Sequence, residues 1–170
     1  MTSLVKNGRG RFSIRLIVVF CGIAVGVGYL ADRYRIGIDR QAETCFPGKR
    51  VYLIDRYDKG PFARGDLVAL RAAGLGPIYP DGATLIKQVA AIAGDRVSVR
   101  IKETTVNGRP VCFGLDLADK MGLAATDFER DAIVPEGFIF PTASARNSFD
   151  GRYWGWADLA QAVGRAWFIY

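Results

Sequence analysis

One lysine interrupts a long run of apolar residues. Lys87 lies within Leu85–Ala93, and the turn Gly94–Asp95 follows at once. Removing an ammonium group from water costs hydration energy, so burial favours the neutral amine, which can accept a proton. The chain contains no histidine, and this excludes histidine-based triads, histidine-ligated zinc and histidine proton shuttles. If the chain performs hydrolytic chemistry, lysine is therefore the natural base.

The alternative for Lys87 is an ordinary surface lysine. Lysines in apolar strands commonly lay their methylene stem on the protein surface and keep the charge in water. The choice between these interpretations depends on what the rest of the chain places beside Lys87.

The length of the chain is sufficient for one domain and one short additional segment. It has 170 residues, half of them hydrophobic, and a net charge of +6. The basic residues are scattered, and their densest cluster directly precedes an apolar segment, so a membrane explains the charge better than nucleic acid does. We expect no nucleic-acid partner. The basic cluster comprises Lys6, Arg9, Arg11 and Arg15.

Residues 16–31 form an uncharged, mostly apolar segment, slightly shorter than the ~20 residues that span a bilayer comfortably. The preceding basic residues predict that residues 1–15 are cytoplasmic and that 16–31 are a transmembrane signal anchor. The alternative is a cleaved signal peptide, although Tyr29 and Ala31 make a poor cleavage site. Either way, residues 32–170 are predicted to be exported, and an uncleaved chain would be a single-pass protein of the inner membrane with its C-terminal domain in the periplasm.

The exported part has the pattern of strands joined by tight turns. Asn107–Gly108 between two short β-prone runs is a strong hairpin signal. These signals predict a mainly β fold, a compact antiparallel and barrel-like sheet. Leu115–Arg130 is predicted to be a loop or a short helix, and Asp158–Val163 a helix. The predicted strands include Arg50–Ile54, Asp66–Leu70, Thr84–Ile92, Val97–Ile101, Thr104–Val106, Gly137–Phe140 and Ala166–Ile169.

Two of the three cysteines, Cys45 and Cys112, lie in the exported part, whereas Cys21 lies in the apolar segment. Two thiols in an oxidising compartment can pair. A disulfide between Cys45 and Cys112 would compete with a catalytic role for either residue.

Four motifs occur in an order that resembles the signal peptidase I family of membrane-anchored serine proteases. Cys45–Gly48 follows the membrane segment, the lysine motif runs from Ile86 to Val97, and Val106–Gly108 matches the family's Val-Asn-Gly hairpin. Ser148–Gly155 matches its C-terminal Ser-x-Asp-Ser-Arg box, with Gly151 where serine is usual. The resemblance implies the family's fold and a peptidase that uses lysine as the base.

The resemblance extends over about residues 14 to 170 and is stronger to the TraF-type branch, the peptidases of conjugative transfer systems. That branch has a Ser-x-Pro nucleophile motif, and Arg50–Ile54 and Ser148–Asp150 are similar to its strand and its C-terminal box. Membership of that branch implies that the substrate is an exported precursor such as a pilin, which some systems join into a cyclic product.

The nucleophile is where this chain departs from the family. The Ser-x-Pro pattern puts the nucleophile at Cys45, and the Ser-x-x-Pro pattern would put it at Thr44. We prefer Cys45, because its offset to Pro47 fits the TraF-type branch and because a thiol is more nucleophilic than a hydroxyl. Beside Lys87, a thiol can give up its proton at rest, so a thiolate–ammonium pair is expected.

The C-terminal box supplies three further candidates. The resemblance implies that the hydroxyl of Ser148 orients the Lys87 amine. Asp150 and Arg152 are interpreted as a structural pair, because guanidinium and carboxylate form a fixed fork. The alternative is that the box is only a polar turn.

The function predicted from the sequence is therefore a membrane-anchored peptidase that cleaves, and in some cases cyclises, an exported precursor by a Cys45–Lys87 dyad. Two alternatives stay open: a non-catalytic or redox-gated component of a conjugation or secretion apparatus, and a general signal peptidase I. No cofactor and no metal are predicted. The expected partners are the precursor protein and the membrane.

Overall fold

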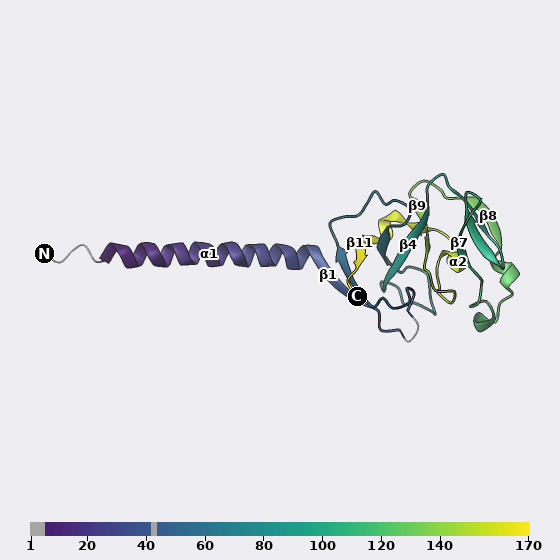
Figure 1. The fold of residues 1–170 in the computed structure, drawn as a ribbon, viewed down its shortest axis with the longest axis horizontal. Coiled ribbons are helices and arrows are strands. Elements are labelled where there is room, and N and C mark those ends of the chain that lie inside the picture. Colours follow the sequence, from purple (N-terminus) through teal and green to yellow (C-terminus); the bar gives the residue numbers. More distant parts are fainter. Residues whose placement is uncertain (1–5, 42–43) are drawn as a thin grey trace. The chain divides into compact units, whose positions relative to one another are not determined.

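The computed structural model describes residues 6–41 and 44–170, with the side chains described from residue 12 onward. The chain divides into two compact units, residues 1–35 and 36–170. The first unit consists of the helix α1, Lys6–Arg33 (Figure 1). Its portion Phe12–Arg33 has a mean hydropathy of 2.2 and is long and apolar enough to cross a membrane. The predicted segment 16–31 lies inside this helix.

Strands dominate the second unit, together with the four-residue helix α2, Gly151–Trp154, and three 3₁₀ turns. The strands are β1 Tyr34–Ile38, β2 Val51–Asp55, β3 Leu67–Arg71, β4 Thr84–Ile92, β5 Arg96–Val99, β6 Glu103–Val106, β7 Arg109–Phe113, β8 Arg130–Ile133, β9 Phe138–Thr142, β10 Ala157–Asp158 and β11 Ala162–Phe168. The 3₁₀ turns are Asp119–Met121, Ala125–Phe128 and Leu159–Gln161.

The strands form two sheets. The larger has seven strands in the order β1-β2-β11-β3-β4-β9-β10 and the smaller has four in the order β7-β6-β5-β8. The pairings from β2 to β10, and all those in the smaller sheet, are antiparallel. This confirms the predicted fold class. The larger sheet stays open, because β1 and β10 are its two edges.

The long strand β4 has the alternation of a sheet that packs on both faces. Leu85, Lys87, Val89 and Ala91 are buried, whereas the residues between them are half-buried. A period of two places these four side chains on one face of the sheet. One core cluster includes Ala91, Val97 of β5 and Phe140 of β9, so it holds the two sheets together.

The hairpin between β6 and β7 follows the prediction closely. Asn107 and Gly108 have φ angles of 51° and 77°, the left-handed region at both positions that a tight two-residue hairpin turn needs. The Asn107 side chain also donates to Asp95 Oδ1 at 2.7 Å and accepts from the Arg96 N–H at 2.9 Å. The Val-Asn-Gly motif and the Gly-Asp turn after β4 are therefore joined in one hydrogen-bonded corner.

One predicted element is wrong. Asp158–Val163 is not a helix: Asp158 ends β10, Leu159–Gln161 is a single 3₁₀ turn, and β11 begins at Ala162. The side chain of Asp158 caps that turn by accepting from the Ala160 N–H at 2.8 Å. Strand pairing with β2 and β3 on both sides draws the following residues into the sheet, and tertiary pairing of this kind overrides local helix preference. Leu115–Arg130, predicted as loop or short helix, contains two 3₁₀ turns and the first residue of β8.

Candidate functional site

Three segments far apart in the sequence bring Cys45, Lys87 and Ser148 together. Lys87 Nζ lies 3.2 Å from Cys45 Sγ and 2.8 Å from Ser148 Oγ, and it donates to both. The Ser148 hydroxyl in turn donates to Cys45 Sγ at 3.5 Å. These three distances describe a closed triangle of a thiol, an amine and a hydroxyl.

Lys87 is held in this triangle by β4. Its side chain is 1% exposed, so it is not the surface lysine of the alternative interpretation. In the sheet it pairs with Val68 of β3, and the buried face of β4 directs its stem inward. A buried amine costs free energy unless its hydrogens find acceptors, and Cys45 and Ser148 provide two.

Cys45 lies in the loop before β2 and is half-buried. Its carbonyl accepts from the Ala145 N–H at 3.0 Å, which ties it to the loop that carries Ser148. Thr44, the alternative nucleophile, instead donates its hydroxyl to the Phe46 carbonyl at 2.9 Å. The geometry therefore places Cys45, and not Thr44, against the lysine.

Asp150 and Arg152 form a buried ion pair, both 0% exposed. Arg152 Nε donates to Asp150 Oδ1 at 2.9 Å, and Nη2 donates to Oδ2 at 3.0 Å. Asp150 Oδ2 also accepts from the Ala143 N–H at 3.2 Å, and its Oδ1 accepts from the Arg152 N–H at 3.1 Å, which caps α2. Neither side chain contacts Cys45 or Lys87 through a described hydrogen bond, which fits the structural role expected of this pair.

Arg152 also fixes the loop that carries Ser148. Its Nη2 donates to the carbonyls of Ala145 and Ser148 at 3.1 and 3.2 Å. On its other side, Nη1 donates to the carbonyls of Phe113 and Gly114 at 2.8 and 2.9 Å. One side chain therefore connects the end of β7 in the smaller sheet to the loop that carries Ser148. The box is more than a polar turn.

The glycine at position 151 has a steric explanation, because the space beside it is already filled. A Cβ built on it would lie 2.6 Å from the Pro141 carbonyl oxygen and 2.8 Å from the Phe140 ring. Real Cβ atoms do not approach other atoms this closely, so the serine usual at this place in the family would require both the Pro141 backbone and the Phe140 ring to move. The departure noted in the sequence follows from how β9 packs against α2.

All three cysteines are free thiols, so the structure does not contain the disulfide weighed for Cys45 and Cys112. Cys112 is buried on β7. Burial raises the pKa of its thiol to about 11. At neutral pH Cys112 is therefore a protonated, unreactive thiol, in contrast to the accessible position of Cys45.

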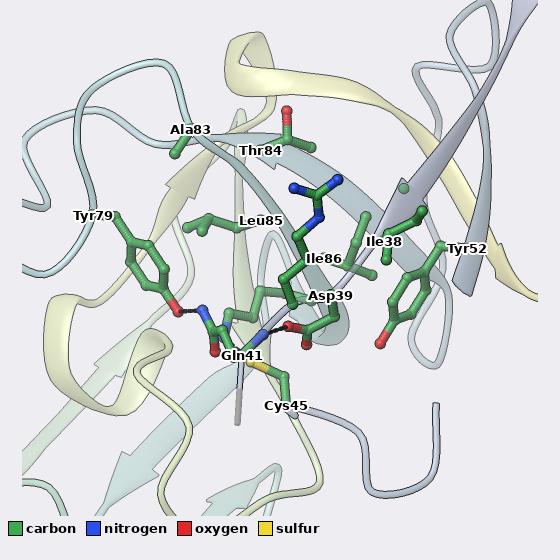
Figure 2. Close-up of a pocket in the computed structure, with 13 residues that line it drawn as sticks. Ile38, Asp39, Gln41, Cys45, Tyr52, Tyr79, Ala83, Thr84, Leu85 and Ile86 are labelled. Atoms are coloured by element: carbon green, nitrogen blue, oxygen red, sulfur yellow. Dashed lines mark hydrogen bonds between the residues drawn. The ribbon is translucent and has the colours of Figure 1, made fainter. Parts of the chain in front are cut away.

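A cavity of about 470 Å³ lies beside Cys45 and Lys87, and we call it the strand pocket. Figure 2 shows Leu85 and Ile86 on its wall, with Tyr79 and Tyr52 at opposite sides. Burial, more than the nearby charge of Asp39, raises the pKa of Tyr52 to about 12, so its hydroxyl stays protonated at neutral pH. The lining residues are Gly37–Gln41, Cys45, Tyr52, Tyr79 and Ala83–Lys87.

The strand pocket runs along a free edge of β4. β9 pairs with β4 only over Gln88–Ile92, and β3 occupies the other edge of Thr84–Lys87. In the described part of the chain, Thr84–Lys87 therefore has one edge without a strand partner. Unpaired N–H and C=O groups at such an edge are a template for an extended peptide.

The sequence analysis missed two residues of this site, Gln41 and Tyr79. Gln41 Nε2 donates to the Tyr79 hydroxyl at 3.1 Å (Figure 2). Both lie in irregular segments outside every motif, so no periodic signal marks them. Among the described residues, no group of three acidic or cysteine side chains is arranged to hold a metal ion.

Comparison with known proteins gives a consistent set of similarities. A family model described as "Signal peptidase, peptidase S26" matches residues 10–170. The chain is 36% identical over 132 residues to a probable conjugal transfer protein TraF of Sinorhizobium fredii. This match covers 69% of this chain and 67% of that protein. It is also 36% identical over 74 residues to a conjugal transfer protein TraF of Agrobacterium fabrum, covering 43% of this chain and 41% of that protein.

The solved structures give a more distant similarity. A signal peptidase I from Enterococcus faecalis has a TM-score of 0.40 and 21% identity, covering 62% of this chain and 97% of that one.

Proposed function

Since this chain belongs to the signal peptidase family, peptidase S26, we propose that it is a membrane-anchored peptidase that cleaves an exported precursor through Cys45 and Lys87. The observation that carries this proposal is the position of Lys87 Nζ, 3.2 Å from Cys45 Sγ and 2.8 Å from Ser148 Oγ. An amine at hydrogen-bond distance from a nucleophile, oriented by a third group, is the arrangement that activates a nucleophile for acyl transfer.

The hydrogen bonds around the Cys45 sulfur support a thiolate–ammonium pair as the resting state. Cys45 Sγ accepts from both Lys87 Nζ and the Ser148 hydroxyl. Two donors and a cation favour the thiolate over the thiol. We propose that Cys45 attacks as a thiolate while Lys87 carries the proton.

The reaction then has two halves. Sγ attacks the scissile carbonyl carbon, and the C–N bond breaks as the Lys87 ammonium gives its proton to the leaving amine. This leaves a thioester and a neutral lysine, which removes a proton from water as the water attacks the thioester. The acid product leaves, and Cys45 and Lys87 return to the ion pair with no net change of protons.

The strand pocket supports an extended peptide as the acyl part of the substrate. An extended peptide can add to the free edge of β4 over Thr84–Lys87 by main-chain hydrogen bonds. The apolar side chains of Ile38, Leu85 and Ile86 line the pocket beside it. The helix α1 would tether enzyme and membrane-bound precursor together, which raises their effective concentration.

The proposed substrate class is a pilin-type precursor of a conjugative transfer system. The two TraF relatives are named as conjugal transfer proteins, and this supports conjugation over general secretion. We propose that the chain is anchored in the inner membrane with residues 36–170 on the periplasmic side, where such precursors emerge.

The test is an in vitro cleavage assay. The full-length protein in detergent, under reducing conditions, is incubated with a pilin-type precursor and with a general secretory precursor, and products are identified by mass spectrometry. We expect cleavage of the pilin-type precursor that Cys45→Ala and Lys87→Ala each abolish. Cleavage that survives Cys45→Ala would remove this nucleophile.

Two other outcomes identify the rival functions. Faster cleavage of the general precursor would support a general signal peptidase I. An intact pilin precursor together with an intact general precursor would support a non-catalytic component of the transfer apparatus.

A further inference from the structure

A second cavity of about 390 Å³ also borders Cys45, and we call it the Lys120 pocket. It shares Gln41, Cys45 and Tyr79 with the strand pocket. Lys87 lines only the strand pocket, whereas Ser148 lines only the Lys120 pocket. The nucleophile therefore stands at the junction of two cavities. The lining residues are Gln41, Thr44, Cys45, Ile78, Tyr79, Leu117, Lys120, Asn147, Ser148 and Phe149.

The C-terminal box builds the wall of the Lys120 pocket. The Tyr153 hydroxyl accepts from the Leu117 N–H at 3.0 Å, which fixes the loop after β7. The Phe149 ring stacks on Tyr153 with centroids 5.8 Å apart and meets the Tyr79 ring at 6.1 Å. Ser148, which lies beside the nucleophile, belongs to the same short segment. The position of this wall relative to the Cys45 sulfur is therefore fixed.

The two cavities differ in what they can bind. The strand pocket has the free main-chain edge of β4, which an extended acyl segment can join. The residues of the Lys120 pocket come from irregular segments and from the loop before α2, without a free strand edge in its lining. A peptide whose carbonyl carbon reaches Cys45 from the strand pocket continues past the scissile bond, and the Lys120 pocket is a second cavity bordering Cys45 that can receive it.

Apart from the reacting sulfur of Cys45, the Lys120 pocket has one described charged side chain. Among the lining residues that the structure describes, Lys120 is the only aspartate, glutamate, lysine or arginine. Lys120 is exposed and has no ion pair with any described residue. The nearby Asp116 is already paired with Arg146 at 3.0 Å. Ile78, Leu117 and Phe149 form the apolar part of the lining, beside polar side chains that include Thr44 and Asn147.

We propose that the Lys120 pocket binds the part of the substrate that follows the scissile bond and selects an acidic side chain within an apolar segment there. This inference rests on the proposed function and adds a specificity determinant to it. Lys120 supplies the charge that recognises the acidic side chain, while Ile78 and Leu117 take up its apolar neighbours.

The experiment uses the full-length protein in detergent and two peptides that share one acyl side. They differ only after the scissile bond, where one carries aspartate and the other lysine within the first three positions. We expect the wild type to cleave the aspartate peptide with about two- to fivefold higher kcat/KM, the range of an exposed charge pair. Lys120→Glu should reverse that preference.

Two controls separate this subsite from general damage. Lys102→Glu makes the same charge change at an exposed lysine outside both pockets and should keep the wild-type preference. A thioester with the same acyl side and a small leaving group has nothing to place in the Lys120 pocket. Its turnover should be equal in wild type and Lys120→Glu.

A second variant tests the cavity without using charge. Ile78→Trp should fill the Lys120 pocket, raise KM for both peptides severalfold and leave thioester turnover unchanged. An unaltered preference in Lys120→Glu, or an equal loss on the thioester, would overturn the subsite while the peptidase function stands. If the wild type cleaves neither peptide nor thioester, the proposed function fails, and the subsite fails with it.

Discussion

At the scale of single residues, the informative feature is the set of groups that contact the buried amine of Lys87. Lys87 is almost fully buried, and its two described hydrogen-bond partners are a thiol and a hydroxyl. A purely structural lysine would pair with a carboxylate, since that neutralises its charge. A lysine paired with a thiol and a hydroxyl is compatible with the proton transfer that we propose.

Ser148→Ala tests the positioning of this amine. Losing the acceptor at 2.8 Å leaves Lys87 free to turn away from Cys45, and we expect kcat to fall about 10- to 100-fold, part of what a placed proton-transfer group contributes. Ser144→Ala is the matched control, because Ser144 is exposed in the same loop. Equal kcat in the two variants would show that Ser148 does not orient the lysine.

Alkylation distinguishes the two thiols of the β domain. Cys112 is buried, and burial raises the pKa of its thiol to about 11, so iodoacetamide at pH 7.5 should leave it unmodified in the folded protein. Cys45 should be modified, and Lys87→Ala should slow that reaction by removing the cation that favours thiolate. The measurement is peptide mapping by mass spectrometry over time; faster modification of Cys112 than of Cys45 would contradict the assignment.

At the scale of elements, one buried side chain joins the site to the fold. Arg152 contacts Asp150, the end of β7 and the loop that carries Ser148. The position of the loop that carries Ser148 therefore depends on the packing of the smaller sheet. That sheet itself contributes no residue to the Cys45–Lys87–Ser148 triangle.

Arg152→Leu should be strongly destabilising, because it leaves Asp150 as an unpaired buried charge. We expect a loss of about 3–5 kcal/mol in the free energy of unfolding, measured by urea titration. The matched variant Arg146→Leu removes the exposed pair with Asp116 and should cost about 0–1 kcal/mol. Similar losses for the two variants would show that Arg152 is not the connection proposed.

The corner after β4 predicts a pH dependence of stability. Hydrogen bonding from Arg64 is the largest cause that lowers the pKa of Asp95 from 3.8 to about 2. Because the folded-state pKa lies below the unfolded one, this carboxylate stabilises the fold above about pH 4. The stabilisation is lost as pH falls through about 2.

Asp95→Asn should therefore be less stable than wild type above pH 4, with the difference shrinking toward pH 2. Thermal unfolding across pH 2–6 checks this. Asp131→Asn is the control: Asp131 also has a lowered pKa, caused mainly by Arg96, but its pair with Arg96 is exposed, so a smaller effect is expected. A pH-independent difference in Asp95→Asn would contradict the assignment.

At the scale of the whole molecule, the chain combines an apolar helix with a β domain of its own compact fold. Deleting residues 1–33 should leave kcat/KM on a short soluble peptide unchanged, because the site lies entirely within residues 36–170. Cleavage of a membrane-inserted precursor in liposomes should fall by at least about tenfold, since tethering raises effective concentration. Equal losses on both substrates would indicate that the helix is needed for the β domain itself.

The sequence by itself determined most of the strands, the hairpin at Asn107–Gly108 and the unusual position of Lys87 among apolar residues. These are local signals: a period of two, a turn that needs positive φ, and a charged residue among apolar ones. Its one wrong element, Asp158–Val163, lies where pairing with distant strands outweighs local preference. The resemblance added the order of the motifs, and with it Cys45 and Ser148 as candidates.

Only the tertiary structure decided how those candidates meet. Cys45, Lys87 and Ser148 are separated by 42 and 61 residues, and no local pattern encodes their distances of 3.2 and 2.8 Å. The same holds for the free edge of β4, which exists because β9 ends its pairing at Gln88, and for the Lys120 pocket, whose walls come from four separate segments. Periodicity reports which face of an element is buried, whereas contacts between elements depend on chain closure and packing across the whole domain.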